Sequence, residues 1–424
     1  MALARAVKDV FIVSAKRTAF GTYGGKLTGK TATDLMEVAA KSALAEGNVN
    51  PAAVGGVVIG NVLHSAVDTI YIARHVGLRC GVPVGVPALT VNRLCGSGFQ
   101  AIVNGAQEIM LGDCNIVLVG GSDNMSQSPF AVRNIRFGTK LGQDLKLEDL
   151  MWAALTDSHT GLPMAITAEN LAEQYNISRE DCDKYALQTQ QRWKQAQDSG
   201  VFKAEITPMT LKGRKGPEVF EVDEHPRPQT TMETLGKLPT VFKKNGTVTA
   251  GNASGVCDGA AALVLANEQA IKDHNLKPLA RLVSYGIAGC DPKIMGIGPA
   301  PASRAALKAI GKEVKDMDIV DVNEAFAPQF LAVAKELGLN NDITNMAGGA
   351  IALGHPLAAS GARITGHLVH ELQPEANPDT VCRQLCSDVC LCKLILEEHV
   401  TPESIKRSGS MGPNSYCILI FPVD

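Results

Sequence analysis

The sequence lacks the features that would link it to a membrane, a secretory route or a nucleic acid. None of its apolar runs reaches the roughly 18 residues that a membrane-spanning helix needs. No secretory signal with a long apolar centre is present. The 40 basic and 43 acidic residues give a net charge of -3, which offers no attraction for a polyanion. We therefore expect no transmembrane segment and no nucleic-acid partner.

A paired cysteine framework is also missing, although the chain has 11 cysteines. Their spacing is not that of a small disulfide-bonded secreted domain, so a reducing compartment is expected. Five of them lie in the last 43 residues. The 424 residues are 45% hydrophobic and 20% charged, which is typical of a soluble protein with two or three domains.

Strand-like and helix-like runs alternate along the chain, which predicts an α/β layered fold. A polar region at 124–249 separates two series of strands. In each series, glycine-rich turns after the third strand lead into a helix that begins near a Ser-Gly pair. This likeness predicts two duplicated half-domains, with Cys95 and His355 at corresponding helix starts that face each other. The predicted strands are 10–15, 57–63, 87–91, 115–121, 279–287, 318–326 and 343–355.

The region between the two series contains a pair of predicted helices at 165–176 and 178–200. Ser178 and Asp181 have the spacing of an N-terminal cap for the second helix. We interpret the whole region as an insertion placed over a binding face. The stretch 248–266 then returns to a strand and closes the first half.

Cys95 stands where the apolar strand 87–91 gives way to a helix, in the stretch "NRLCGSGFQAI". Apolar residues recur at helical spacing after it. The positive end of the helix dipole favours a thiolate at that place, and a thiolate is the nucleophilic form of cysteine. The alternative is a small buried hydrophobic residue, and this stretch alone favours the alternative.

Six segments resemble the thiolase family in order and spacing, most of all its mitochondrial 3-ketoacyl-CoA branch. The resemblance covers residues 8–372. The segments are "NRLCGSGFQAI" (92–102), "GGSDNMS" (120–126), "MAITAEN" (164–170), "TAGNASGVCDGAAA" (249–262), "VNEAFA" (322–327) and "GGAIALGHPLAASGARI" (348–364). Several long motifs in register are a far more specific signal than one glycine-rich turn.

The resemblance implies a five-layered α/β/α/β/α fold of two duplicated half-domains with an inserted loop domain that holds coenzyme A. The expected N-terminal half comprises 1–123 and 250–270. The expected loop domain is 124–249, and the C-terminal half is 271–372. The remaining 373–424 form a divergent tail.

The resemblance also implies an acyltransferase of fatty acid β-oxidation. It would cleave a 3-ketoacyl-CoA with CoA, or run the reverse Claisen condensation. Cys95 would carry the acyl group as a thioester, and His355 would take the thiol proton. His355, together with a water positioned by Asn323, would hold the oxygen of the departing acetyl-CoA enolate.

For CoA, the resemblance points to Arg227 and Thr230 at the nucleotide or phosphate end, since arginine pairs with phosphate through two donors. It points to Ser254 near the pantetheine arm. CoA and acyl-CoA are thus expected as substrates, with no permanently bound cofactor and no metal. A homodimer or homotetramer in the mitochondrial matrix is expected by the same resemblance.

Each of these residues has a simpler explanation when taken alone. A single histidine among apolar residues such as His355 is more often satisfied by a backbone carbonyl than catalytic. Asn323 could cap a helix. Taken in family order, the catalytic interpretation of Cys95 and His355 is preferred. The ketoacyl synthases also use a cysteine at a helix start, but they rely on two histidines and are disfavoured.

The family pattern ends at Leu372. A second cysteine, in a Cys-x-Gly-Gly-Gly-x-Gly turn, should follow and serve as a further proton donor, but the chain has no such turn. That turn joins the last two strands of the second half, so these strands are expected to be missing and a sheet edge to be exposed. An alternative function follows, namely a catalytically impaired or inactive CoA-binding or interaction protein.

The tail leaves two further possibilities open. Its cysteines could bind a metal, although their spacing matches no common zinc pattern. The stretch "YCILIF" at 416–421 resembles a buried strand and could fill the vacant position in the sheet. The cysteines concerned are Cys382, Cys386, Cys390 and Cys392, and the role of the second cysteine is not transferred to Cys382 or Cys386.

Two smaller departures from the family lie within the matching region. Ala358 stands where thiolases commonly carry glycine, and a positive φ there would strain an alanine. Asp123 stands where the family usually has glutamate, which is one methylene longer.

Overall fold

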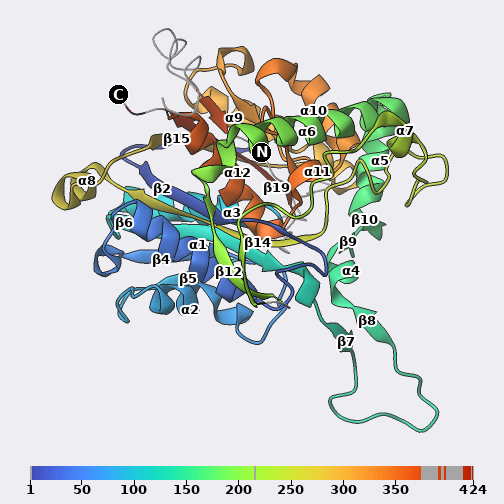
Figure 1. Cartoon of the computed structure of the whole chain (residues 1–424), viewed down its shortest axis with the longest axis horizontal. Coiled ribbons are helices and arrows are strands. Elements are labelled where there is room, and N and C mark those ends of the chain that lie inside the picture. Colours follow the sequence, from blue (N-terminus) through green and yellow to red (C-terminus); the bar gives the residue numbers. More distant parts are fainter. Residues whose placement is uncertain are drawn as a thin grey trace, which may run out of the picture.

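The computed structural model describes residues 2–213, 216–373, 390–392, 396–397, 414–421 and 423. Most of its strands form one connected mixed sheet, whose main path has the order β16-β17-β19-β15-β2-β14-β6-β4-β5 (Figure 1). These strands are β2 (Phe11–Thr18), β4 (Gly56–Gly60), β5 (Ala88–Val91), β6 (Ile116–Asn124), β14 (Cys257–Ala266), β15 (Ala280–Gly289), β16 (Val320–Asp321), β17 (Cys390–Cys392) and β19 (Asn414–Phe421).

Helices cover both faces of each half of this sheet. The pair α1 and α2 packs on the outer face of the first half, and α9 and α10 pack on the outer side of the second half. Between the halves lie α3 and α12, whose apolar side chains share one core with strands of both halves. The helices are α1 (Ala32–Glu46), α2 (Ile72–Arg79), α3 (Ser97–Leu111), α9 (Pro299–Ala309), α10 (Ala327–Leu337) and α12 (Leu357–Glu371). The layers therefore follow the expected α/β/α/β/α order.

The central strands are largely apolar because helices cover them on both faces. All residues of β6 and β14 are buried, and both strands are rich in Val, Leu, Ala and Gly. Such runs lack the alternation of a half-exposed strand, which is why the sequence pattern already indicated buried strands.

The two halves repeat the same strand pairing. In the first half, β4 is parallel to β6, β6 is antiparallel to β14, and β14 is antiparallel to β2. In the second half, β16 is parallel to β17, β17 is antiparallel to β19, and β19 is antiparallel to β15. The third strand expected at 343–355 is reduced to one bridge between Thr344 and Val320, followed by α11 (Ala350–Leu353). The duplication inferred from the glycine-rich turns is thus visible in the pairing.

The expectation that the second half lacks its last two strands is corrected here. The strand β19 pairs with β15 along its whole length, and β17 lies between β19 and β16. The apolar run "YCILIF" explains this, because a continuous apolar stretch suits a buried strand, and Ile418 and Ile420 are both buried in the shared core. Cys382 and Cys386 lie outside the described residues.

Replacing Ile420 with alanine tests whether the tail strand belongs to the core. We expect the free energy of unfolding to fall by about 2–5 kcal/mol, the usual cost of truncating a fully buried isoleucine. Urea unfolding followed by circular dichroism measures it. The matched control is Leu111→Ala at the exposed end of α3, which should change stability by less than about 0.5 kcal/mol. Equal, small effects of both variants would contradict the docking of β19.

The region between the halves contains the predicted helix pair as α5 (Met164–Gln174) and α6 (Arg179–Ser199). Ser178 and Asp181 form the reciprocal capping box at the start of α6, as their spacing indicated. The hairpin of β7 (Phe130–Val132) and β8 (Leu147–Asp149) extends away from the body of the molecule (Figure 1). None of the helices in the described part of the chain combines the length and apolarity that crossing a membrane requires.

A buried charge cluster joins α12 to the first half of the sheet. Arg17 on β2 forms ion pairs with Glu205 at 2.7 Å and with Asp223 at 2.7 Å. The Nδ1 atom of His367 on α12 lies 2.8 Å from Glu205. Burial would raise the pKa of Glu205, but the charges of Arg17 and His367 outweigh it and hold the pKa well below its usual range. Glu205 is therefore ionised at neutral pH and favours a protonated His367.

The stability of the protein is expected to fall as pH rises through the pKa of His367. Burial lowers this pKa, but Glu205 outweighs burial and raises it above its ordinary value of 6.5. The stabilisation is thus complete below about pH 6.5 and is lost as the pH passes the raised value. Urea unfolding between about pH 6 and 9 should show this decline in the wild type and a flatter profile in His367→Gln. Parallel profiles would contradict the prediction.

Candidate active site

A cavity of about 210 Å³ lies where both halves and the inserted region meet. Four of the predicted site residues line it: Cys95, Ser254, Asn323 and His355. The rest of its wall is mostly apolar and includes Val62, Leu94, Met125, Leu155, Met164, Phe242, Met295, Phe326 and Leu357. A largely apolar cavity with a few convergent polar groups is typical of a small-molecule site.

Cys95 lies on a tight turn between β5 and α3. Leu94 just before it has a φ of +45°, a left-handed conformation that costs a non-glycine residue about 1–2 kcal/mol. The Asn92 side chain holds the turn, because Oδ1 accepts from the Leu94 N–H at 2.9 Å and Nδ2 donates to the Val62 carbonyl at 3.1 Å. The turn presents Cys95 to the cavity two residues before α3 begins at Ser97.

Five other cysteines have less reactive environments. Burial raises the pKa of Cys114 to about 11 and those of Cys80, Cys182 and Cys290 to about 12. Burial also raises the pKa of Cys257 well above its usual value. These five thiols remain protonated near neutral pH, whereas Cys95 lies at the positive end of a 15-residue helix.

His355 lies between α11 and α12, where the backbone bends sharply. Gly354 before it has a φ of +96°, and a Cβ at Gly354 would lie 2.1 Å from the Cys257 sulfur. The His355 N–H donates to the Gly255 carbonyl at 2.9 Å. Pro356 then leads into α12. Only glycine fits at 354, so this bend fixes the direction in which the imidazole projects.

The imidazole of His355 has a neighbour on each nitrogen. Its Nδ1 lies 2.6 Å from the Ser360 hydroxyl, one turn along α12. Its Nε2 lies 3.5 Å from the Asn323 Nδ2, which can only donate. With the Asn323 amide and the Ser360 hydroxyl oriented in this way, Nε2 acts as the acceptor and Nδ1 donates its proton to Ser360. In this tautomer Nε2 is the nitrogen available to accept a thiol proton.

Asn323 follows β16 and offers a second polar atom to the cavity. Its Oδ1 is buried and has no hydrogen-bond partner within the part of the chain that the structure describes. Buried polar atoms are rarely left in this state unless a ligand or water completes them. The Asn323 amide can therefore hold a water or a polar ligand group next to His355.

Glu324 fixes the backbone near both Asn323 and His355. The sequence alone did not point to this residue. Its carboxylate accepts from Tyr185 at 2.6 Å, from Asn345 at 2.9 Å and from the Ile351 N–H at 3.1 Å. Thr189 on α6 donates to it as well. Burial raises the pKa of Glu324, while these donors oppose the increase. The only available signal was its place beside Asn323 in "VNEAFA".

The structure places one of the three predicted CoA residues, Ser254, at the cavity and the other two away from it. Ser254 lines it, and its N–H donates to the Ala325 carbonyl at 2.9 Å. Arg227 and Thr230 do not line it; they share an exposed turn in which Thr230 donates to the Arg227 carbonyl at 2.7 Å. The Arg227 Nη1 donates to three backbone carbonyls of its own loop.

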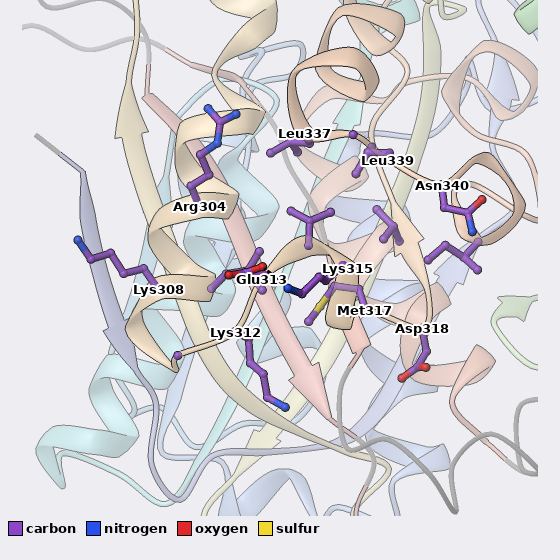
Figure 2. A pocket seen from close by; sticks show the side chains of 16 residues that line it. Arg304, Lys308, Lys312, Glu313, Lys315, Met317, Asp318, Leu337, Leu339 and Asn340 are labelled. Atoms are coloured by element: carbon purple, nitrogen blue, oxygen red, sulfur yellow. Dashed lines mark ion pairs between the residues drawn. The ribbon is translucent and has the colours of Figure 1, made fainter.

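A larger groove of about 940 Å³ lies elsewhere, on the outer side of the second half (Figure 2). Its polar rim carries ion pairs, such as that between Lys315 and Glu313 at 2.8 Å. Arg304 is paired with Glu336 at 2.8 Å. Its lining contains no cysteine or histidine, so its size alone does not make it a catalytic site. No three histidines, cysteines or acidic residues in the described ranges could jointly hold a metal ion.

Comparison with known protein families matches almost the whole chain. The thiolase N-terminal domain matches residues 10–269, and the thiolase C-terminal domain matches residues 276–392. The second match continues past Leu372 to the end of β17.

Individual relatives and solved structures give the same result. The chain is 64% identical over 367 residues to the mitochondrial 3-ketoacyl-CoA thiolase of Bos taurus, covering 87% of this chain and 92% of the relative. The Homo sapiens protein of the same name is 63% identical with the same coverage. The crystal structure of human mitochondrial 3-ketoacyl-CoA thiolase in complex with CoA has a TM-score of 0.89, 55% identity and 99% coverage of both chains.

Proposed function

Because this chain belongs to the thiolase family, we propose that it cleaves 3-ketoacyl-CoA with CoA to give acetyl-CoA and a shortened acyl-CoA. The reverse Claisen condensation uses the same groups. The observation that carries the proposal is the single cavity lined by Cys95, His355 and Asn323. The relatives are named for this substrate class and for the mitochondrion, so we place the reaction in mitochondrial fatty acid β-oxidation.

In the first half of the reaction, the Cys95 thiol transfers its proton to Nε2 of His355. The thiolate attacks the 3-keto carbon, and the bond between C2 and C3 breaks. The acyl group stays on Cys95 as a thioester, while the electron pair leaves as the acetyl-CoA enolate. Two donors hold the enolate oxygen, namely His355 and a water bound to Asn323. His355 then returns the proton to C2.

In the second half of the reaction, CoA releases the acyl group. Its thiol gives a proton to the now neutral His355, and the CoA thiolate attacks the thioester carbon. The tetrahedral intermediate collapses, the acyl-CoA leaves, and Cys95 recovers the proton. One imidazole with a fixed tautomer can serve both half-reactions, because it starts and ends each one in the same state.

The proposed CoA path runs from the exposed turn to the cavity. Arg227 and Thr230 would contact the nucleotide end at the surface, where a guanidinium can pair with phosphate. Ser254 would lie beside the pantetheine arm at the cavity wall. We propose no permanently bound cofactor.

We also propose that the chain divides into an N-terminal half (1–123 with 250–270), a loop domain (124–249), a C-terminal half (271–372) and a tail (373–424).

We also propose a homodimer or homotetramer. The strand β5 ends the sheet and leaves a backbone edge unpaired within the described strands. Large apolar side chains stand exposed near it: Leu89 is 46% exposed, Tyr71 57% and Val84 75%. An apolar sheet edge of this kind is usually covered by another chain.

An assay of purified protein with acetoacetyl-CoA and a longer 3-ketoacyl-CoA tests the proposal. Substrate loss should require CoA, and mass spectrometry without CoA should find an acyl group on Cys95. The inactive alternative predicts neither turnover nor acylation. Nothing in the cavity favours that alternative, since the cysteine, the imidazole and the amide are all in place.

A further inference from the structure

Two residues that depart from the thiolase pattern, Asp123 and Ala358, are in direct contact. The Asp123 Oδ2 accepts from the Ala358 N–H at 2.7 Å. Asp123 lies near the end of β6 in the first half, and Ala358 lies in the first turn of α12 in the second half. Ala358 has helical geometry rather than a positive φ, so the strain considered from the sequence does not arise.

Asp123 links three segments around the catalytic cavity. Its side chain is fully buried. Besides Ala358, its Oδ1 accepts from the Leu63 N–H at 2.9 Å and from the Val62 N–H at 3.1 Å. The Asn61 side chain donates to the same oxygen at 3.1 Å. Because Val62 and Leu357 both line the cavity, one carboxylate holds two of its walls together.

The first turn of α12 has almost no room to move. A Cβ at Gly121 would lie 2.0 Å from the Ala358 carbonyl oxygen, and one at Gly98 would lie 2.5 Å from it. Gly98 is in the first turn of α3, three residues after Cys95. The Ala358 methyl belongs to the apolar cluster that also contains Val62 and packs against Cys95. A displacement at Ala358 therefore changes the position of His355, three residues earlier, relative to Cys95.

We propose that Asp123 is a positioning residue for His355 and that Asp123 and Ala358 form a length-matched pair. The proposal rests on the proposed function of the cavity. The short side chain of Asp123 can reach the Ala358 N–H only if the start of α12 lies close to β6. The methyl of Ala358 fills the space that a smaller residue would leave there. Lengthening the acid or removing the methyl alone shifts the helix start, whereas making both changes restores the distance.

A double-mutant cycle with Asp123→Glu, Ala358→Gly and the double variant tests the pair. For acetoacetyl-CoA thiolysis, each single change should lower kcat by about 10-fold with KM within about twofold, a loss equal to one misplaced hydrogen bond. The double variant should recover to within about threefold of the wild type, and coupling of this kind is expected only between residues in contact. Additive losses in the double variant would overturn the proposal.

The rate at which iodoacetamide alkylates Cys95 across pH provides a second readout that needs no turnover. The apparent pKa of Cys95 should shift in each single variant and return in the double variant, because it depends on the place of His355. The matched control is Asp258→Glu, a buried acid on the adjacent β14 that holds Ser126 at 2.9 Å. It should lower stability and leave this pH profile unchanged.

The two measurements test different claims. Thiolysis tests the proposed function, and the alkylation profile tests the positioning role of Asp123. If the wild type shows no thiolysis but the alkylation profile is coupled between Asp123 and Ala358, the function fails and the positioning role stands. If thiolysis occurs and all four proteins share one alkylation profile, the function stands and the positioning role is refuted.

Discussion

Cys95→Ser is expected to lower kcat for thiolysis by about 10⁴-fold or more while leaving the fold intact. A hydroxyl fills nearly the same space at the start of α3, but its pKa is far above that of a thiol. His355 and the helix dipole cannot make it an effective nucleophile near neutral pH. Spectrophotometric assay of acetoacetyl-CoA cleavage measures the loss, and no acyl group should be found on residue 95.

The control for this prediction is Cys114→Ser. Cys114 is a half-buried thiol just past the C-terminal end of α3, whereas Cys95 precedes its N-terminal end. Since burial raises the pKa of Cys114 to about 11, it should contribute nothing to catalysis. Its variant should keep kcat within about twofold of the wild type, as is usual for changes away from a reacting centre. A Cys95→Ser protein that retained a tenth of the wild-type rate would refute the nucleophile.

Most of the strands, and the turns that carry Cys95 and His355, could be predicted from the sequence because local pattern determines both. The catalytic interpretation of the two residues rests on the family resemblance and not on either stretch alone. Buried runs such as β6 and β14 are largely apolar, and Cys95 and His355 each lie beside glycines that mark a turn into a helix. The inserted helices were also predictable, since Ser178 and Asp181 carry a cap signal. In these cases the residues that decide the structure lie within a few positions of one another.

Other parts of the site depend on contacts that one-dimensional patterns do not show. The left-handed turn at Leu94 goes against the preference of leucine and is held by Asn92. Glu324 meets its partners from α6 and from the turn before α11 only in the folded protein. The strand β19 was expected to be absent because its sequence does not match the family, although its apolar run suits the vacant position. Strand pairing uses backbone groups, so it tolerates such a change of sequence.

His355→Asn is expected to reduce kcat by about 10²–10⁴-fold, the usual contribution of a positioned general base. Asparagine can still hydrogen-bond with Ser360 through an amide atom near the position of Nδ1, but it cannot accept a proton from Cys95. The loss should be visible in acyl-enzyme formation, because His355 must take the Cys95 proton in that step. Rapid-mixing measurement of the acylation step with acetoacetyl-CoA tests this directly, and His274→Asn on the exposed α8 (Glu268–His274) is the matched control.

Ser360→Ala refines the same prediction. It removes the partner of Nδ1 at 2.6 Å and keeps the imidazole, so the two tautomers become closer in energy. A neutral hydrogen bond of about 0.5–1.5 kcal/mol corresponds to about a 2- to 10-fold loss of kcat. The double variant with His355→Asn should be no slower than His355→Asn alone, since Ser360 acts only through the imidazole. A further loss in the double variant would show that Ser360 acts on the substrate itself and would reassign the tautomer of His355.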